Sequence, residues 1–234
     1  MNATAVLSLP PEDRIKLAKA IQVKLRNKIS TYYPAEGPLS RDKYAKHLEF
    51  FAAGNTHRER CFLAANRVGK TEGVGAYETT LHLTGLYPEW WTGRRFQAPI
   101  TAWAAGDTSQ TTRDILQEKL LGPQADLGTG MIPGDSILRT TSKPGVPDAI
   151  ETVYVKHASG GTSELTLKNY EQQRTSFQGT ARHVIWLDEE CSMEIYAECL
   201  LRTMTSDGLI ICTFTPLLGL SDVVKYFLDL KAAE

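Results

Sequence analysis

The sequence predicts an α/β fold in which a mainly parallel central sheet is flanked by helices. Three observations predict it: short apolar runs of strand length, helix-like segments between them, and a chain of 234 residues, which is long enough for one large domain or for a domain with a small appendage. The strand-like runs cover residues 61–65, 100–105, 151–156, 163–168, 183–187 and 208–214, and the helix-like segments cover residues 70–84, 109–121, 192–204 and 220–231. Apolar strands that alternate with helices are typical of a sheet covered on both faces.

The composition is that of a globular protein with a real core, since 42% of the residues are hydrophobic. No apolar run approaches the roughly 20 residues that span a bilayer, and the N-terminus lacks the pattern of a secretory signal. The four cysteines form no C-x-x-C pair, which favours a reducing cytosol without a zinc site. The net charge of −1 neither indicates nor excludes a nucleic-acid partner, because a basic groove can be balanced by acidic residues elsewhere.

Two helices are predicted before the first strand-like run. Residues 11–29 have the pattern of an amphipathic helix with Pro11 in its first turn. Its apolar side comprises Ile15, Ala18, Ile21, Val23 and Leu25. Residues 40–53 form a second helical pattern, with Ser40 as the expected cap. Further along the chain, residues 122–148 are rich in Gly, Pro and Asp, and we expect an irregular excursion there.

The stretch from Ala64 to Thr71, AANRVGKT, resembles the phosphate-binding pattern G-x-x-x-x-G-K-[ST]. In that pattern backbone N–H groups ahead of a helix face the phosphates, the lysine neutralises the β- and γ-phosphates, and the hydroxyl binds Mg²⁺. Gly69 and Lys70 match, whereas Ala64 replaces the first glycine, so we expect a variant first turn. The pattern predicts ATP and Mg²⁺ as cofactors. The residues expected at the nucleotide are Ala65, Asn66, Arg67, Val68, Gly69, Lys70, Thr71 and Glu72.

Two alternatives stay open at this loop. A G-K-T sequence with one glycine missing also occurs in strand-to-helix turns that merely carry a surface lysine, although a strand-like run precedes the loop here and a helix-like segment follows it. Arg67 is either a catalytic cation that reaches the γ-phosphate or a solvated arginine.

A second strand-like run ends in carboxylates, as the stretch HVIWLDEE at residues 183–190 shows. Ligands collect at the carboxyl ends of strands in open α/β sheets, so Asp188 and Glu189 are expected at the same edge as the loop. We assign Asp188, with Thr71, to the magnesium shell and Glu189 to activation of the attacking water, with Glu190 as the alternative base. Loop and acidic strand together predict a P-loop NTPase of the additional-strand, catalytic-glutamate type.

Four stretches resemble the N-terminal ATPase domain of the large terminase subunit of tailed bacteriophages. They are ANRVGKTEG, GLYPEWWTGRRFQAPITAWAAGDT, YEQQRTSFQGTARHVIWLDEE and TFTP, and they cover roughly residues 45–225 in that family's order. By this resemblance Asp188 and Glu189 are the magnesium-binding and catalytic couple. TFTP, from Thr213 to Pro216, resembles the coupling motif, in which a hydroxyl, here that of Thr213 or Thr215, senses the γ-phosphate. The alternative interpretation of TFTP is a strand end followed by a turn.

The resemblance implies a motor that uses ATP hydrolysis to drive double-stranded DNA through a portal protein into an empty capsid. It also implies a homo-oligomeric ring on the portal, of five subunits in that family, and a small terminase subunit that helps to choose the DNA. We therefore expect the protein in the cytoplasm of the infected bacterial host, outside any membrane and absent from the mature virion.

The chain is expected to have two parts, an N-terminal helical or lid segment on the adenine side at residues 1–58 and a P-loop ATPase core at residues 59–234. The terminase family also carries a C-terminal RNase H-like nuclease domain. Because the sequence ends about where that domain would begin, we expect ATP hydrolysis without DNA cleavage.

Two sets of residues have less specific assignments. Ring ATPases complete their sites with an arginine from the neighbouring subunit, and we favour Arg174, which together with Arg182 flanks TSFQGTA before the acidic strand. The other candidates are Arg94, Arg95, Arg113 and Arg139, and each of these arginines could instead form a structural ion pair. An aromatic side chain is expected to stack on adenine, and the candidates are Tyr32, Tyr33, Tyr44, Phe50 and Phe51.

Two rival functions stay open on the sequence. One is a helicase or remodelling ATPase of another P-loop family, which an unwinding assay would separate from a translocase of intact duplex. The other is a nucleotide-binding assembly module without turnover, which the variant loop allows.

Overall fold

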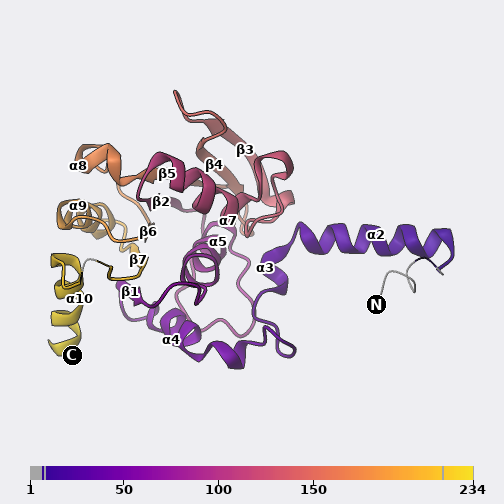
Figure 1. Ribbon diagram of the computed structural model, residues 1–234, viewed down its shortest axis with the longest axis horizontal. Coiled ribbons are helices and arrows are strands. Elements are labelled where there is room, and N and C mark those ends of the chain that lie inside the picture. The colour runs from indigo at the N-terminus through magenta and orange to yellow at the C-terminus, as the bar shows by residue number, and fades with distance from the viewer. Residues whose placement is uncertain (1–6, 8, 218, 234) are drawn as a thin grey trace.

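The described part of the chain forms one mixed sheet, and its architecture confirms the predicted α/β class. The computed structural model describes residues 7, 9–217 and 219–233 (Figure 1). Seven strands lie in the order β1-β7-β6-β2-β5-β4-β3. They are β1 (Glu59–Leu63), β2 (Thr101–Gly106), β3 (Ile137–Ser142), β4 (Ile150–Lys156), β5 (Thr162–Asn169), β6 (Val184–Asp188) and β7 (Leu209–Phe214).

Five neighbouring strands are parallel, from β1 across β7, β6 and β2 to β5, whereas β4 and β3 extend the sheet in antiparallel fashion. Strand β7 comes last in the sequence but lies between β1 and β6, as an additional strand should in the predicted class. The register pairs Leu63 with Phe214 and Asp188 with Thr213. The carboxyl ends of β1, β7 and β6 therefore meet at one edge, where open α/β sheets bind ligands.

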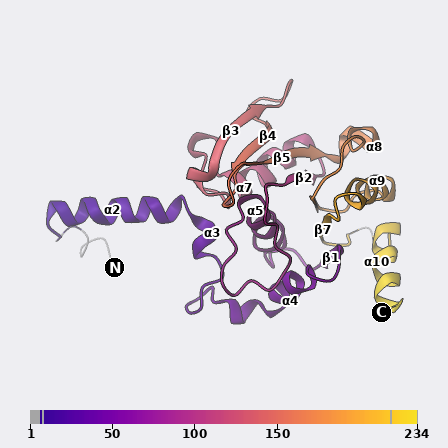
Figure 2. The same cartoon turned by 180° about the vertical axis from the view of Figure 1, so that it is seen from behind.

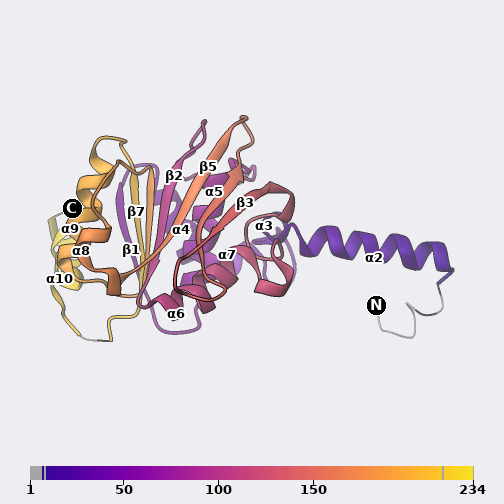
Figure 3. The same ribbon diagram turned by 90° about the horizontal axis from the view of Figure 1, so that it is seen from above.

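Helices cover both faces of this sheet, as Figure 3 shows. One face carries α4 (Ala45–Ala53), α5 (Tyr77–Thr84) and α7 (Glu118–Leu121), and the other carries α8 (Gln173–Ser176), α9 (Met193–Met204) and α10 (Asp222–Ala233). The π-type segments η2 (Lys70–Ala76) and η3 (Thr112–Gln117) lead into α5 and α7. Trp186 and Leu187 of β6 belong to different apolar clusters, because successive side chains of a strand point to opposite faces. The remaining short elements are α6 (Ser109–Thr111), η4 (Gln124–Asp126), η5 (Gly134–Ser136) and η6 (Tyr170–Gln172).

The helix that follows the phosphate loop rests directly on Trp186. A Cβ atom at Gly75 would lie 2.1 Å from the indole ring, so only glycine permits this approach. The indole Nε1 in turn donates a hydrogen bond to Thr213 Oγ1 at 2.7 Å. The start of η2–α5 therefore packs against β6 and β7, the strands that carry Asp188 and Thr213.

The N-terminal helix differs from its prediction. Instead of one helix over residues 11–29, the chain forms α2 (Pro11–Leu25) and a short α3 (Lys28–Thr31). Helix α2 projects from the body of the molecule and buries none of its residues, so its predicted apolar side is exposed to solvent (Figures 1 and 2). Helical periodicity specifies a face, but burial also requires an element to pack against it.

Two further predictions need correction. Residues 137–142 form β3, although the whole of 122–148 was expected to be irregular; the segment lacks an apolar run and is a strand because it pairs with β4. Ser40 does not cap a helix through its side chain, since the chain enters α4 by way of a 3-10 turn, η1 (Arg41–Tyr44). None of the helices described is both long and apolar enough to cross a membrane.

Candidate nucleotide-binding site

The phosphate loop connects the end of β1 to the start of η2 and has its left-handed residues late in the turn. They are Arg67, with a φ of 67°, and Gly69, with a φ of 87°. Ala64 is not among the residues with positive φ, and its N–H donates to the Phe214 carbonyl at 3.3 Å. The alanine that replaces the first glycine therefore needs no left-handed backbone conformation. In this variant turn the left-handed conformations occur at Arg67 and Gly69.

Lys70 is held inside the loop by Asn66. The buried Lys70 Nζ donates to Asn66 Oδ1 at 3.2 Å. Thr215 Oγ1 lies 3.0 Å from the same Asn66 oxygen and 2.8 Å from the Ala64 carbonyl. Asn66 thus connects the loop lysine to the residue that follows β7, a role that the sequence pattern did not reveal because any residue is allowed at this position of the motif.

Asp188 lies at the end of β6 with only 2% of its surface exposed. Thr71 Oγ1 donates to its Oδ2 at 3.3 Å, and Thr213 Oγ1 donates to its Oδ1 at 2.7 Å. These two hydroxyls are its side-chain hydrogen-bond partners within the described residues. Burial raises the pKa of Asp188 to about 7, and the Thr213 hydrogen bond offsets this only in part. The two predicted magnesium ligands, Thr71 and Asp188, are therefore adjacent.

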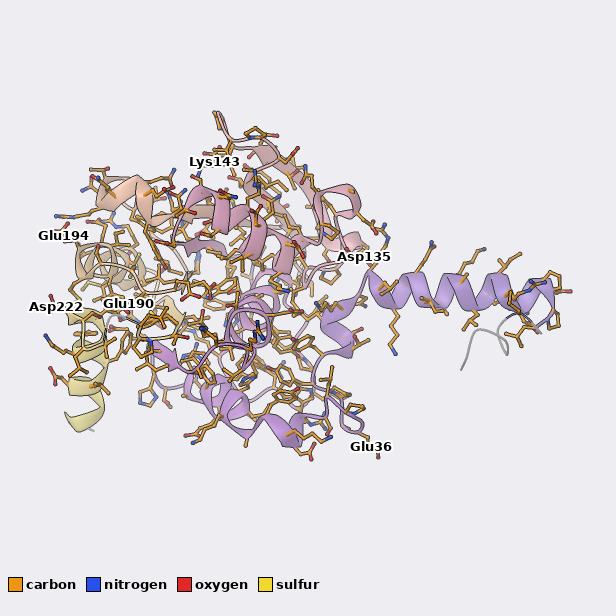
Figure 4. All side chains as sticks on the ribbon, viewed as in Figure 1. Glu36, Asp135, Lys143, Glu190, Glu194 and Asp222 are labelled. Atoms are coloured by element: carbon orange, nitrogen blue, oxygen red, sulfur yellow. The ribbon has the colours of Figure 1, made fainter. Side chains whose placement is uncertain are left out.

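Glu189 follows in a left-handed conformation with a φ of 64°. Strain of this kind is retained where the surroundings hold it, commonly at functional sites. The Tyr170 hydroxyl lies 2.9 Å from the Asp188 carbonyl and 3.2 Å from the Glu189 carbonyl, and it braces this turn. Glu190, the alternative base, has one buried carboxylate oxygen without a hydrogen-bond partner in the described part of the chain, and Figure 4 shows it on the side of α9 and α10.

A pocket of about 260 Å³ adjoins the loop on the side of the N-terminal segment. It is lined by Tyr32, Tyr33, Leu39, Tyr44, His47, Arg67, Val68, Gly69 and Gly73. The three tyrosines among the five aromatic candidates for the adenine side therefore face this pocket, whereas Phe50 and Phe51 are buried in the core. His47 was not singled out, because a lone histidine within a helical pattern carries no sequence signal.

Several other candidates have partners of their own. Glu72 forms salt bridges with Lys28 and Lys119, the second at 3.1 Å. Arg174 Nε donates to Glu198 of α9 at 3.1 Å. Arg182 stacks on Trp103, and because it precedes β6 it lies at the opposite edge of the sheet from Asp188.

A loop lysine, a threonine hydroxyl and a buried aspartate thus meet at the ends of β1 and β6, with β7 between these strands. This arrangement, together with the order of the strands, identifies the fold as that of a P-loop NTPase.

Comparisons with known proteins narrow the class to a family. The family described as terminase large subunit, T4-like-virus type, N-terminal, matches residues 61–233. The large terminase subunit of Salmonella phage P22 is 38% identical over 205 residues, which cover 79% of this chain and 41% of that protein. The chain belongs to the terminase large-subunit family, and it spans about two fifths of the length of this relative.

Solved structures agree on the fold. The large terminase ATPase domain of Thermus phage P74-26 matches with a TM-score of 0.53 at 15% identity, over 80% of this chain and 73% of that one. A variant of the same domain gives a TM-score of 0.50 at 14% identity, over 80% of this chain and 74% of that one. At these identities the likeness concerns the fold alone.

Proposed function

We propose that this chain is the ATPase motor part of a phage DNA-packaging terminase and couples hydrolysis of Mg-ATP to translocation of double-stranded DNA into a capsid. The observation that carries the proposal is the contact of Thr71, from the phosphate loop, with the buried Asp188, from the acidic strand, at 3.3 Å. The family membership of the chain supports the same function.

In this proposal the loop amides from Ala65 to Glu72 and the ammonium of Lys70 hold the phosphates. Glu189 accepts the proton of the attacking water, and Arg67 reaches the γ-phosphate. Thr213 and Thr215 act in coupling. This role is supported by their contacts, because one hydroxyl bonds to Asp188 and the other lies against the loop at Ala64 and Asn66.

The residues at the loop fit Mg²⁺. In nucleotide sites this ion binds one or two protein oxygens and takes its other ligands from phosphate and water. Thr71 and Asp188 offer one hydroxyl and one carboxylate, and no group of three or more His, Cys, Asp or Glu that could hold a metal by itself occurs among the described residues. Bound Mg²⁺ would neutralise charge on the β- and γ-phosphates.

The assembly is part of the proposal. We infer a homo-oligomeric ring, a pentamer, on a portal protein, with a small terminase subunit as partner and the cytoplasm of the infected host as the location. Arg174 is the proposed arginine in trans. Since its Nε is bound to Glu198, it would have to exchange this ion pair for the neighbour's nucleotide. Residues 1–58 would form the adenine side and residues 59–234 the ATPase core.

Paired substitutions test the catalytic assignment. Lys70→Ala should abolish both ATP binding and turnover, whereas Glu189→Ala should keep binding within about 3-fold and slow phosphate release by about 10²–10⁴-fold, as for loss of a general base. Binding is measured with a fluorescent ATP analogue, and phosphate release is measured in the presence of DNA and portal protein. Normal turnover in Glu189→Ala would transfer the role to Glu190 or overturn the site. Unwinding of a duplex without translocation would favour a helicase, and binding without turnover in the wild type would favour an assembly module.

A further inference from the structure

Two side chains of the N-terminal segment form hydrogen bonds with the phosphate loop and its helix. His47, from α4, has its Nε2 atom 3.1 Å from the Val68 carbonyl. Tyr33, which precedes α4, has its hydroxyl 2.5 Å from His47 Nδ1 and 2.8 Å from the Gly73 carbonyl. Both side chains are almost fully buried, so water does not compete for these contacts.

The hydrogen bonds fix the state of the imidazole. The Val68 carbonyl can only accept, so the His47 proton is on Nε2. Burial lowers the pKa of His47, which keeps the ring neutral and leaves Nδ1 as an acceptor for the Tyr33 hydroxyl. The Gly73 carbonyl lies within reach of the same single hydroxyl proton, so Tyr33 serves one of the two acceptors at a time.

The contact with Val68 determines how the next amide points. The Val68–Gly69 peptide unit is planar and trans, so a carbonyl aimed at His47 directs the Gly69 N–H away from His47. The fit is tight, because a Cβ atom at Gly69 would lie 3.3 Å from the His47 ring and one at Gly73 would lie 2.9 Å from the Tyr33 hydroxyl. The loop backbone therefore packs directly against these two side chains, with no room for a side chain at either glycine.

The same two side chains line the pocket beside the loop, together with Tyr32, Tyr44 and Arg67. Aromatic walls suit a flat nucleobase. We propose that Tyr33 and His47 are positioning residues that link occupation of this pocket by the nucleoside to the conformation of the phosphate loop, so that the loop distinguishes a nucleoside triphosphate from a bare triphosphate. This inference rests on the proposed nucleotide site.

The chain contains a matched control for this pair. Tyr87 donates its hydroxyl to His82 Nδ1 at 2.8 Å, and His82 is fully buried. This second tyrosine–histidine pair has the same chemistry as the first, and its other hydrogen bonds are with the Glu78 carboxylate and the backbone N–H of Phe96, away from the loop. Tyr33→Phe and Tyr87→Phe therefore remove the same group from similar surroundings.

Calorimetric titration of the full chain with Mg-ATP and with Mg-tripolyphosphate tests the proposal. Tyr33→Phe should weaken ATP binding by about 3- to 10-fold, the range expected for one hydrogen bond, and change tripolyphosphate binding by less than about 2-fold. Tyr87→Phe should change neither affinity, even where urea denaturation shows an equal loss of stability. His47→Gln, which retains a donor near the Nε2 position, should bind ATP more tightly than His47→Asn, which does not.

Three results would overturn the inference. Equal weakening of both ligands in Tyr33→Phe would indicate a structural role only. An unchanged ratio of the two affinities in Tyr33→Phe and in both His47 variants would exclude a link between pocket and loop. Failure of the wild type to bind either ligand would remove the proposed function as well, whereas the first two results leave that function intact.

Discussion

Two fully buried carboxylates of this protein lie in opposite electrostatic surroundings. Glu78 of α5 receives two hydrogen bonds from Arg60, at 2.6 and 3.1 Å, and a third contact from His82. Within the described residues, the Asp188 carboxylate of β6 receives side-chain hydrogen bonds from two threonine hydroxyls. Burial alone would raise the pKa of Glu78, but Arg60 and His82 outweigh it and hold the pKa below its usual value, whereas the pKa of Asp188 rises to about 7.

This difference is the one expected between a structural acid, Glu78, and the magnesium ligand that we propose, Asp188. Glu78 has its cation inside the chain, and the pair joins α5 to β1. Asp188 forms no salt bridge within the described residues, and the charge of Lys70 lowers its pKa less than burial raises it, although it lies next to a hydroxyl that suits Mg²⁺. A buried carboxylate without an ion-pair partner is costly, which supports the proposal that a bound ligand brings the counter-charge of Asp188.

The largest expected effect comes from removal of the internal cation. Arg60→Met should lower the free energy of unfolding by about 3–5 kcal/mol, because it leaves Glu78 buried without its main partner. Urea denaturation at neutral pH measures the loss. Arg60→Met combined with Glu78→Gln should recover part of it, since the uncompensated charge is then gone. A loss below about 1 kcal/mol in the single variant would contradict the contrast with Asp188.

The pH dependence of stability should have opposite signs at the two acids. Asp188 has a raised pKa in the folded state, so its contribution is fully present below its unfolded pKa of 3.8 and is lost as the pH rises towards about 7. At about 1.4 kcal/mol per pKa unit, the full decline in the free energy of unfolding is roughly 4–5 kcal/mol. Glu78 has a lowered pKa, so its contribution is present above the unfolded value and is lost only as the pH falls through the folded one.

Asp188→Asn isolates the contribution of Asp188 to the pH dependence of stability. Without nucleotide, the difference in unfolding free energy between Asp188→Asn and the wild type should grow in favour of the variant between about pH 4 and pH 7. Urea denaturation across this range provides the measurement, and Glu78→Gln should give a difference that does not grow in this direction. A constant difference for Asp188→Asn would show that the folded protein does not hold this carboxylate at a raised pKa.

The sequence could predict this site because the motifs are local while the fold brings them together. Thr71 and Asp188 are far apart in the chain, but the phosphate loop joins Thr71 to the end of β1, and Asp188 is the last residue of the buried strand β6. The carboxyl ends of these parallel strands share one edge of the sheet. The coupling role of Thr213 and Thr215 is inferred from the resemblance of TFTP to the family's motif, and it stays a prediction; the structure places β7 between β1 and β6.

The features that the sequence did not predict depend on packing between elements, which local sequence patterns do not encode. β3 is a strand through its pairing with β4 and contains no continuous apolar run. Helix α2 is predicted to bury an apolar side, but none of its residues is buried against the described part of the chain. His47 reaches the loop only because α4 packs beside η2, so nothing in its sequence neighbourhood predicts the contact.

The smallest effect is expected from a single hydroxyl that shapes the environment of Asp188. Thr213 Oγ1 accepts from Trp186 Nε1 and donates to Asp188 Oδ1, both at 2.7 Å, in a fully buried position. Thr213→Val keeps the shape but leaves the indole N–H without its acceptor, which should cost about 1–3 kcal/mol of stability by urea denaturation. This hydrogen bond lowers the pKa of Asp188, so its loss should raise that pKa. The decline in the free energy of unfolding that accompanies ionisation of Asp188 should then occur at higher pH.

Thr79 provides the control for this substitution. It is equally buried, but its hydroxyl has no hydrogen-bond partner among the residues that the structure describes. Thr79→Val should therefore be neutral or slightly stabilising and should leave the pH dependence unchanged. If both valine variants lost the same stability and kept the wild-type pH profile, the Thr213 hydroxyl would have no special bearing on Asp188. The difference in pKa between Glu78 and Asp188 would then depend on Arg60 alone. The proposed coupling of Asp188 to β7 would need a contact other than the Thr213 hydroxyl.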